Sequence, residues 1–335
     1  MPHLHRFINR LSEPVRSSFG AEFRESPSMI VVTGAAGFIG RQVCETLLEA
    51  GHSVIGLDCL NAYYDPVLKH DRLASLSNKK NFRFIKADIA DLGQMLAHIA
   101  IEDVTHIIHL AAQAGVRHSL EQPFAFGHSN LAGHLSMLEL ARRAPKLAHF
   151  LYASSSSVYG DRAGPFKETD RVDAPASLYA ATKRSCELMS ESYARVLGIA
   201  QTGLRFFSVY GGWGRPDMAY WIFTERLLRG EAIDLFGGGA MSRDLTHISD
   251  IVPAICALMH LPPEGPVPHA LFNLGNANPI RVDALIELLE RITGRCAQKR
   301  FAAAPPGDVK ETFADISAAK ARCDFAPRMG IEAGM

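Results

Sequence analysis

The hydrophobic positions of the chain form short apolar runs that alternate with longer amphipathic segments. Runs rich in β-branched residues predict strands, and apolar residues recurring every three or four positions predict helices. Because parallel strands need crossover connections, this alternation indicates a doubly wound parallel α/β sheet with helices on both faces. The predicted strands are 30–33, 53–57, 82–86, 106–110, 150–154 and 202–206, and the predicted helices are 38–50, 91–99, 129–143 and 178–197.

The pattern changes after Phe206. Gly and Pro cluster at 211–216, 237–239 and 262–268, and the remaining predicted helices, 222–228, 250–259 and 282–293, are irregularly spaced. We therefore expect a first domain at 29–206 and a smaller C-terminal lobe at 207–335, some segments of which return to the first domain. Residues 1–28 lack apolar periodicity, so they are either a mobile extension or a stretch upstream of a true start at Met29.

Composition excludes several classes of function. Lys and Arg number 35, as do Asp and Glu, so the zero net charge gives no electrostatic reason to bind nucleic acid or an anionic membrane. No apolar run approaches the roughly 18 residues of a membrane span, and no signal peptide begins the chain, so a cytoplasmic protein is expected. The 6 cysteines and 14 histidines form no metal-binding pattern, which predicts reduced thiols and no metal site.

The first predicted strand runs directly into the glycine-rich segment TGAAGFIG at 33–40, which opens a helix. Glycines allow a tight turn and let a pyrophosphate approach the backbone, where the helix N-terminus offers free N–H groups. The glycine spacing alone also occurs in helix packing, but the strand before it and the helix after it favour dinucleotide binding in a Rossmann-type domain. The expected cofactor contacts are Gly34, Ala36, Gly37, Phe38, Ile39 and Gly40.

Acidic residues end the next two strands. Asp58 is placed to accept hydrogen bonds from the adenosine ribose and to repel a 2′-phosphate, which favours NAD over NADP. Asp88 ends the third strand and is expected near the adenine amine, and the small residues after the fourth strand allow a cofactor to lie over the backbone. The further expected cofactor contacts are Ile89, Leu110, Ala111 and Ala112.

Tyr179 and Lys183 lie four residues apart at the start of a predicted helix, and so share one of its faces. An ammonium beside a phenol favours the phenolate, which makes Tyr179 a candidate general base and places both residues beside the cofactor. A serine turn at the end of the fifth strand supplies a hydroxyl for the same substrate oxygen. Ser155 is the first candidate and Ser157 the second, while Ser156 is expected to contact substrate or to cap the backbone.

The segments TGAAGFIG, HLAAQAGVRHS, YASSSSVYG, SLYAATK and LRFFSVYGGWGRPDMA together resemble extended short-chain dehydrogenase/reductases that act on nucleotide sugars. The similarity runs from about Met29 to the end of the chain and is strongest to bacterial UDP-glucuronate 4-epimerases. This resemblance implies bound NAD, a UDP-sugar substrate and a homodimer formed through helices 129–143 and 178–197. It also implies that Arg243 approaches the diphosphate, that Asp308 lies near the nucleotide ribose, and that Asn130 supports the site.

For a glucuronate substrate, the resemblance implies a 4-keto intermediate, which is a β-keto acid that loses carbon dioxide readily. An epimerase must therefore hold the carboxylate out of line with the ketone. Arg215 is suited to this because a guanidinium binds a carboxylate through two parallel hydrogen bonds. Ser208 offers a further hydroxyl, and Arg117 is another candidate for binding an anion.

Four other functions are considered. Related 4,6-dehydratases and UDP-glucuronate decarboxylases carry acidic residues where this chain has Ser156 and Ser157, which argues against both activities. UDP-glucose/galactose 4-epimerases usually have Asn in place of Ser208, and a non-catalytic NAD-binding protein would be expected to lack the Tyr–Lys pair. Departures from the family are Cys59, His118 and Gly212, where Asn, Tyr and Pro are usual, and an end at Met335 near the usual final helix.

Overall fold

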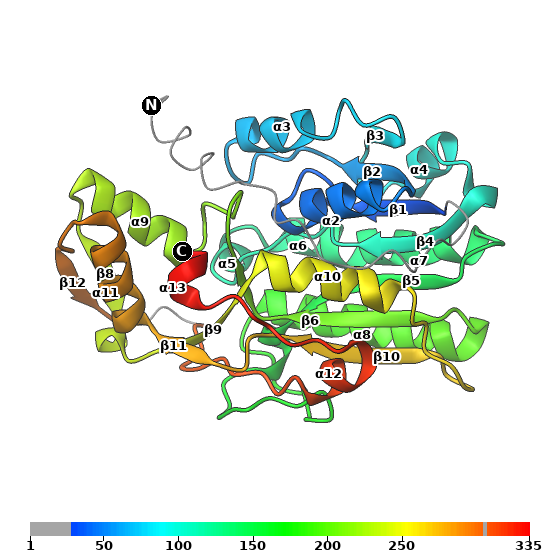
Figure 1. The fold of residues 1–335 in the computed structure, drawn as a ribbon. Helices are drawn as coiled ribbons and strands as arrows, with labels where there is room; N and C mark the ends of the chain where they lie inside the picture. Colours follow the sequence, from blue (N-terminus) through cyan, green and yellow to red (C-terminus); the bar gives the residue numbers. More distant parts are fainter. Residues whose placement is uncertain (1–27, 304–306) are drawn as a thin grey trace.

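The computed structural model describes residues 28–303 and 307–335, so most of the predicted extension lies outside the described residues. All pairings within the central sheet are parallel, and the chain turns back between β3 and β4, which places β4 beside β1 (Figure 1). The predicted doubly wound fold is confirmed. The strand order is β10 (His269–Leu274), β6 (Gln201–Phe206), β5 (His149–Ser155), β4 (Val104–His109), β1 (Met29–Thr33), β2 (Ser53–Asp58) and β3 (Phe82–Lys86).

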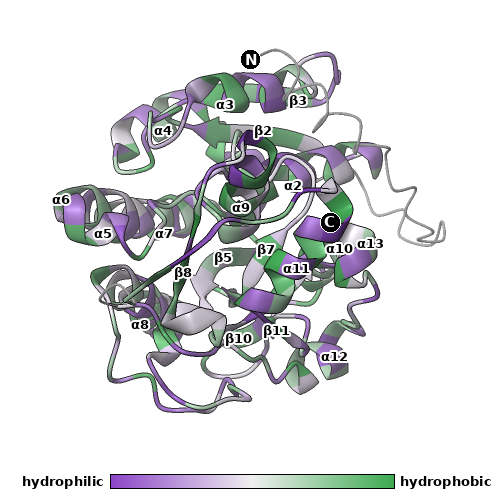
Figure 2. Cartoon of the chain, turned by 90° about the vertical axis from the view of Figure 1, so that its left-hand side faces the viewer, coloured by the Kyte–Doolittle hydropathy of each residue, from purple (hydrophilic) through white to green (hydrophobic). Residues whose placement is uncertain are grey.

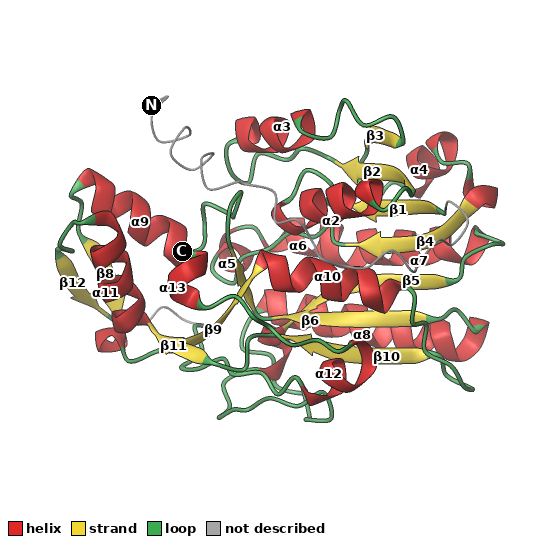
Figure 3. Cartoon of the chain, in the orientation of Figure 1, coloured by secondary structure: helices red, strands yellow, loops and turns green. Residues whose placement is uncertain are grey.

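Helices cover both faces of this sheet (Figure 3). One face is packed by α2 (Phe38–Glu49), α10 (Ile248–Met259) and α12 (Ser317–Cys323), and the other by α4 (Leu92–His98), α7 (Gly133–Arg143) and α8 (Leu178–Leu197). Residues such as Leu47 and Ile255 are buried in the first layer, and Met137 in the second. Because the inner strands β1 and β2 are buried on both faces, their sequences are nearly continuous apolar runs.

Several elements were not predicted. The helix α3 (Pro66–Ala74) follows β2; Asp65 caps its N-terminus by accepting from the Val67 N–H, and Pro66 occupies its first turn. Two short helices, α5 (His118–Glu121) and α6 (Pro123–Phe126), precede a π-helical stretch at Gly127–Ala132 that continues into α7. The predicted helix at 129–143 therefore begins earlier and with irregular geometry.

The C-terminal lobe is a smaller α/β unit beside the carboxyl ends of the sheet (Figure 1). Strands β7 (Ser208–Tyr210), β9 (Ser242–His247) and β11 (Pro279–Arg281) form one small sheet, and β8 (Ile233–Phe236) pairs with β12 (Lys299–Ala302). Helices α9 (Ala219–Arg229) and α11 (Val282–Thr293) pack on them, and α13 (Ile331–Gly334) adds Ile331 to the lobe core. In Figure 2 the helices carry both hydrophobic and hydrophilic residues, as amphipathic helices do.

A buried ion pair stabilises the carboxyl ends of the central strands. Arg205 on β6 donates to both oxygens of Glu187 on α8, at 2.8 and 2.9 Å, and both side chains are 1% exposed. Burial favours the neutral carboxyl, but Arg205 outweighs it and holds the pKa of Glu187 below its usual value. Ser154 also donates to Glu187, at 2.6 Å, so this pair fixes the start of the serine turn. Removing one partner of such a pair costs about 3–5 kcal/mol.

Candidate active site

A cavity of about 810 Å³ lies between the carboxyl ends of the sheet and the C-terminal lobe. Ligands of doubly wound sheets bind where the strand order reverses, and here β1 and β4 meet at that edge. The cavity brings together every site residue expected from the sequence apart from Ala36 and Asn130, which stand just behind its wall.

The glycine-rich segment leaves no room for side chains at its two ends. Gly34 has a φ of +72°, and a Cβ there would lie 2.9 Å from the backbone nitrogen of Ala111. A Cβ at Gly40 would lie 2.0 Å from the Gly34 carbonyl oxygen. Two glycines thus let α2 begin directly against β1, with the first turn of the helix facing the cavity.

Asp58 is held in place by backbone groups. One of its oxygens accepts from the Leu60 N–H at 2.8 Å, and the other accepts from the Ala36 N–H at 3.2 Å. Each carboxylate oxygen has a second lone pair for a ribose hydroxyl, so the expected role remains open to it. Ala36 therefore acts from behind, through its backbone, by tying Asp58 to the glycine-rich segment. The thiol of Cys59, next in sequence, lines the same cavity.

Two cofactor-side residues were not predicted. Lys69, on α3, donates to Asn61 at 2.8 Å and lies 3.7 Å from Asp58, so an ammonium stands beside the expected ribose site. Gln113 is buried in the cavity wall, and its Nε2 has no hydrogen-bond partner among the described residues. An unpaired buried donor beside a glycine cradle fits a ligand rich in acceptor oxygens, as a dinucleotide is. Neither Lys69 nor Gln113 belongs to a sequence motif that would have indicated a role in cofactor binding.

Asp88 stands at the adenine end. Its oxygens accept from the Ala90 N–H at 2.9 Å and pair with His128 at 2.8 Å. Burial acts to raise its pKa, but these two hydrogen bonds prevail and lower it. Asp88 therefore stays ionised and accepting, as an adenine amine requires.

Tyr179 and Lys183 are placed by the first turn of α8. Ser177 caps the helix by accepting from the Ala180 N–H at 3.1 Å. The Lys183 ammonium, 4% exposed, donates to the Ala153 carbonyl oxygen at 2.7 Å, which joins α8 to β5. Both side chains line the cavity. Asn130 supports this turn from behind by donating to Thr182 and to the Gln113 carbonyl oxygen, each at 3.0 Å.

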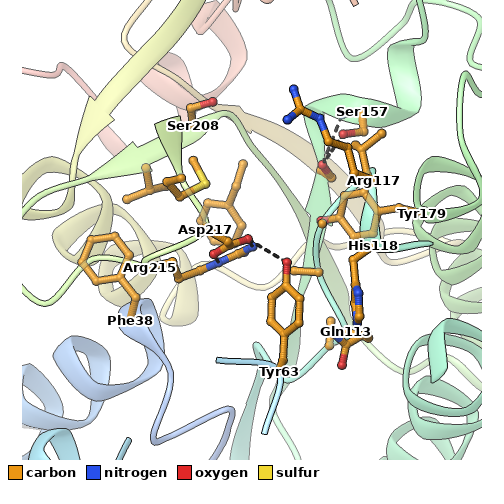
Figure 4. A pocket seen from close by; sticks show the side chains of 18 of the residues that line it. Phe38, Tyr63, Gln113, Arg117, His118, Ser157, Tyr179, Ser208, Arg215 and Asp217 are labelled. Atoms are coloured by element: carbon orange, nitrogen blue, oxygen red, sulfur yellow. Dashed lines mark hydrogen bonds and ion pairs between the residues drawn. The ribbon is translucent and has the colours of Figure 1, made fainter. Parts of the chain in front are cut away.

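The serine turn differs in one detail from expectation. Ser155 is the backbone cap, because its Oγ accepts from the Ser157 N–H at 3.2 Å, and it also bonds the Ser157 hydroxyl at 3.2 Å. The prediction that Ser156 caps the backbone is therefore wrong, because Ser155 occupies the cap position one residue earlier. Ser155, Ser156 and Ser157 all line the cavity, as Tyr179 does, and Ser157 and Tyr179 are labelled in Figure 4.

On the nucleotide side of the cavity, Arg117 of the first domain meets two charged residues of the C-terminal lobe, Arg243 and Asp308. Arg117 pairs with Asp308 at 2.9 Å and lies over the Phe236 ring, 4.8 Å from its centroid. Arg243 donates to the Ser242 carbonyl oxygen at 2.8 Å and is close enough to Asp308 and Arg117 for their charges to act on it. Burial lowers the pKa of Arg243, because desolvation disfavours the charged guanidinium.

Arg215 and Ser208 face the sugar side of the cavity (Figure 4). The Arg215 guanidinium already pairs with Asp217, from Nε at 2.9 Å and from Nη2 at 2.5 Å. Asp217 accepts a further bond at 2.9 Å from the hydroxyl of Tyr63, which belongs to the first domain. The sequence signalled neither Asp217 nor Tyr63, because the two are 154 residues apart.

Residues 30–275 match the model of the NAD dependent epimerase/dehydratase family. The chain belongs to this family. It is 42% identical over 335 residues to UDP-glucuronate 4-epimerase 3 of Arabidopsis thaliana, a match that covers 96% of this chain and 77% of that one.

Solved structures agree with this assignment. UDP-glucuronic acid 4-epimerase from Bacillus cereus, in complex with UDP-glucuronic acid and NAD, is 34% identical with a TM-score of 0.84, covering 91% of this chain and 96% of its own. A UDP-glucose 4-epimerase from Thermotoga maritima, with UDP-glucose, is 32% identical with a TM-score of 0.82, at the same coverage. The predicted resemblance to nucleotide-sugar epimerases is confirmed.

Two further features of the described chain bear on function. Across residues 28–303 and 307–335, no helix combines the length and apolar character that a membrane span requires. In the same residues no group of His, Cys, Asp or Glu side chains is arranged to hold a metal ion. The six cysteines are free thiols.

Proposed function

We propose that this protein interconverts UDP-glucuronate and UDP-galacturonate, with bound NAD, by inverting the configuration at carbon 4. The observation that carries the proposal is one cavity that holds Tyr179 and Lys183, the serine turn, and a partly buried cation, Arg215. Curated and solved relatives named as UDP-glucuronate 4-epimerases support the same substrate.

The residues of the cofactor half fit NAD. The glycine cradle and the α2 N-terminus would hold the pyrophosphate, Asp58 the adenosine ribose and Asp88 the adenine, while Gln113 offers a free donor. When bound, NAD accepts and returns the two electrons that carbon 4 gives up and regains. Asp58 also opposes a 2′-phosphate, because a second anion would meet its charge.

The chain's own side chains handle the proton and the orientation of the sugar. Tyr179 takes the proton of the 4-hydroxyl, and the Lys183 ammonium beside it favours the negative phenolate. Ser155 or Ser157 donates to the same sugar oxygen, which becomes the ketone oxygen when carbon 4 is oxidised. The ketone must turn its opposite face toward the cofactor before it is reduced. Arg243, Asp308 and Arg117 hold the nucleotide meanwhile, so the hexose can rotate without leaving.

The serine turn distinguishes epimerisation from elimination or decarboxylation. Ser156 and Ser157 carry hydroxyls where a carboxyl group would be required to expel water or to protonate an enolate. UDP-glucose epimerisation is the second candidate, and one observation favours it. Arg215 is already paired with Asp217, which leaves a neutral sugar acceptable at that position.

Products formed from UDP-glucuronate test the proposal directly. Purified protein should yield UDP-galacturonate, and substrate deuterated at carbon 4 should retain its label through the reaction. Tyr179→Phe should lower turnover by about 10²–10⁴-fold, because the general base is gone, while leaving NAD bound. UDP-pentose as the sole product, or turnover confined to UDP-glucose, would contradict the proposal.

We further propose that the protein forms a homodimer through α7 and α8. Leu135 on α7 is 43% exposed, and Leu188 on α8 is 52% exposed, so each helix presents apolar side chains to solvent. Paired helices of this kind bury such residues against a second copy. Light scattering after size-exclusion chromatography should give twice the mass of one chain, and a monomer would refute the proposal. A cytoplasmic location stays a prediction from the sequence.

A further inference from the structure

The sugar side of the cavity contains a hydrogen-bonded array of three side chains from two domains. Tyr63 follows β2 in the first domain, whereas Asp217 and Arg215 lie between β7 and α9 of the C-terminal lobe. One Asp217 oxygen accepts from both the Tyr63 hydroxyl, at 2.9 Å, and Arg215 Nη2, at 2.5 Å. The dashed line that reaches the Tyr63 hydroxyl in Figure 4 marks its bond to Asp217.

Tyr63 is itself fixed on two sides. Its ring lies against His118, with centroids 4.5 Å apart. A Cβ placed on Gly115 would come within 2.6 Å of the Tyr63 hydroxyl, so the chain passes close to that oxygen only because residue 115 is glycine. Burial and the Asp217 carboxylate raise the pKa of Tyr63, so the phenol keeps its proton and donates it.

Asp217 determines which edge of Arg215 faces a ligand. A guanidinium has two forked edges, and Asp217 occupies the one formed by Nε and Nη2. The edge formed by Nη1 and Nη2 stays available to a second carboxylate. A ligand carboxylate that moved toward the Nε side would meet the negative charge of Asp217. Arg215 therefore offers a carboxylate one orientation, and it does so in the cavity that Tyr179 also lines.

That orientation bears on the hazard of decarboxylation. In the 4-keto sugar the bond from carbon 5 to the carboxyl carbon can break, and its electron pair then passes to carbon 5 and the ketone as an enolate. Carbon dioxide leaves, water supplies a proton to carbon 5, and reduction at carbon 4 yields a UDP-pentose. The negative charge leaves the carboxylate oxygens in this step. A cation held beside those oxygens opposes the step.

We infer that Tyr63 and Asp217 are positioning residues that fix the orientation in which Arg215 binds a uronate carboxylate and that thereby suppress decarboxylation. This inference rests on the proposed function. It assigns to the β2–α3 segment a part in substrate choice, because Tyr63 reaches the lobe from there.

The first test compares Tyr63→Phe with Tyr210→Phe, which removes a buried phenol hydroxyl of the C-terminal lobe that lies outside the cavity. Losing one hydrogen bond to a charged group should raise the ratio of UDP-pentose to UDP-galacturonate about tenfold in Tyr63→Phe. Tyr210→Phe should keep the wild-type ratio, and calorimetric affinity of Tyr63→Phe for UDP-glucose should stay within about twofold of wild type.

Asp217→Asn provides a second variant of nearly the same size. Its product ratio should also rise about tenfold, and its Kd for UDP-glucuronate should fall, since a like charge has been removed. Product ratios near wild type in both variants would overturn the inference. So would equal losses of affinity for UDP-glucuronate and UDP-glucose, which indicate a general structural role.

The wild-type protein separates this inference from the proposed function. If wild type makes no UDP-galacturonate, the proposed function alone is refuted. The role of the array is then tested by the ratio of the Kd for UDP-glucuronate to the Kd for UDP-glucose. An unchanged ratio in Tyr63→Phe and Asp217→Asn would refute the array as well, and a ratio changed as described would support it.

Discussion

The cofactor end and the substrate end of the cavity are assembled in different ways. At the cofactor end, a stretch of seven consecutive residues between Gly34 and Gly40 turns against the strand that precedes it, and Asp58 closes the neighbouring strand. At the substrate end, Tyr63, Arg117, Arg215 and Asp308 come from separate segments and meet only in the folded protein. The first end is made by local geometry and the second by tertiary contacts.

This difference indicates where each end is sensitive to change. At the cofactor end, the atoms that an added side chain would meet are backbone atoms, which move aside less readily than the end of a flexible side chain. The substrate end is joined by side-chain ion pairs and hydrogen bonds, which can exchange partners when a ligand arrives. Substitutions at the cofactor end should therefore disturb packing and lower stability. Substitutions at the substrate end should change which UDP-sugar is preferred.

At the cofactor end, a large loss of stability is expected for Gly40→Ala. The added Cβ would fall 2.0 Å from the Gly34 carbonyl oxygen, so the glycine-rich segment must shift. Overpacking of this kind should lower the free energy of unfolding by on the order of 3 kcal/mol and release NAD. Urea denaturation and the nucleotide content of the purified protein measure the two effects.

Gly127→Ala is the matched control for this experiment. Gly127 is also helical, with φ −58° and ψ −48°, and a Cβ there meets nothing within 4 Å. The control should keep its NAD and gain slightly in stability. Affinity of Gly40→Ala for UDP should change less than its affinity for NAD, and equal losses of both would contradict the division between the two ends.

An intermediate effect is expected from acid, through histidines buried in the first domain. His149 is 0% exposed and contacts the Met259 carbonyl oxygen at 3.0 Å and the Thr202 hydroxyl at 2.9 Å. Burial lowers its pKa to about 4. The unfolded chain takes up a proton below about pH 6.5 while the folded protein does not, so stability is present above that pH and is lost as pH falls toward 4. His149 alone should cost about 2 kcal/mol at pH 5.

His149→Gln isolates this contribution. The variant should lose about 2 kcal/mol less than wild type between pH 7 and pH 5 in urea denaturation, whatever its stability at pH 7. The exposed His70, changed to Gln, serves as the control and should follow wild type. If His149→Gln and wild type fall in parallel, the proposed titration is wrong.

The smallest effect is expected at Gly212, in the lobe segment ahead of Arg215. A Cβ there meets no atom within 4 Å, and its φ lies outside the left-handed region that favours glycine. Gly212→Ala should raise the free energy of unfolding by about 0.5 kcal/mol by restricting the unfolded chain. A loss of stability, seen as a lower urea midpoint, would show that the segment depends on glycine.

The sequence predicted best what depends on neighbouring residues. The helices at 178–197 and 282–293 have the predicted bounds, because long amphipathic periods specify them. The glycine-rich segment, the Tyr–Lys pair and the serine turn were all recognised from local spacing. The helix α3 was missed although Asp65 and Pro66 are good start signals, because it spans only 9 residues and so offers a short apolar period.

Contacts between distant segments escaped prediction. Nothing local indicates that Tyr63 bonds Asp217 or that Arg117 pairs with Asp308, since each partner alone is an ordinary surface residue. The short strands of the lobe escaped for the same reason. With three to six residues each, β7, β9 and β11 take their form from one another rather than from their own sequence.

One buried arginine has a consequence for how the substrate end can diverge. Arg72 on α3 is 0% exposed and donates to the Ala36 carbonyl oxygen and to those of Trp213 and Gly214. These acceptors are all backbone atoms, so Arg72 constrains the path of the 211–217 segment but not its side chains. Arg215 and Asp217 can therefore be exchanged for other residues on a fixed frame. A designer seeking a new sugar specificity should vary those two positions and keep Arg72 and the shape of the loop.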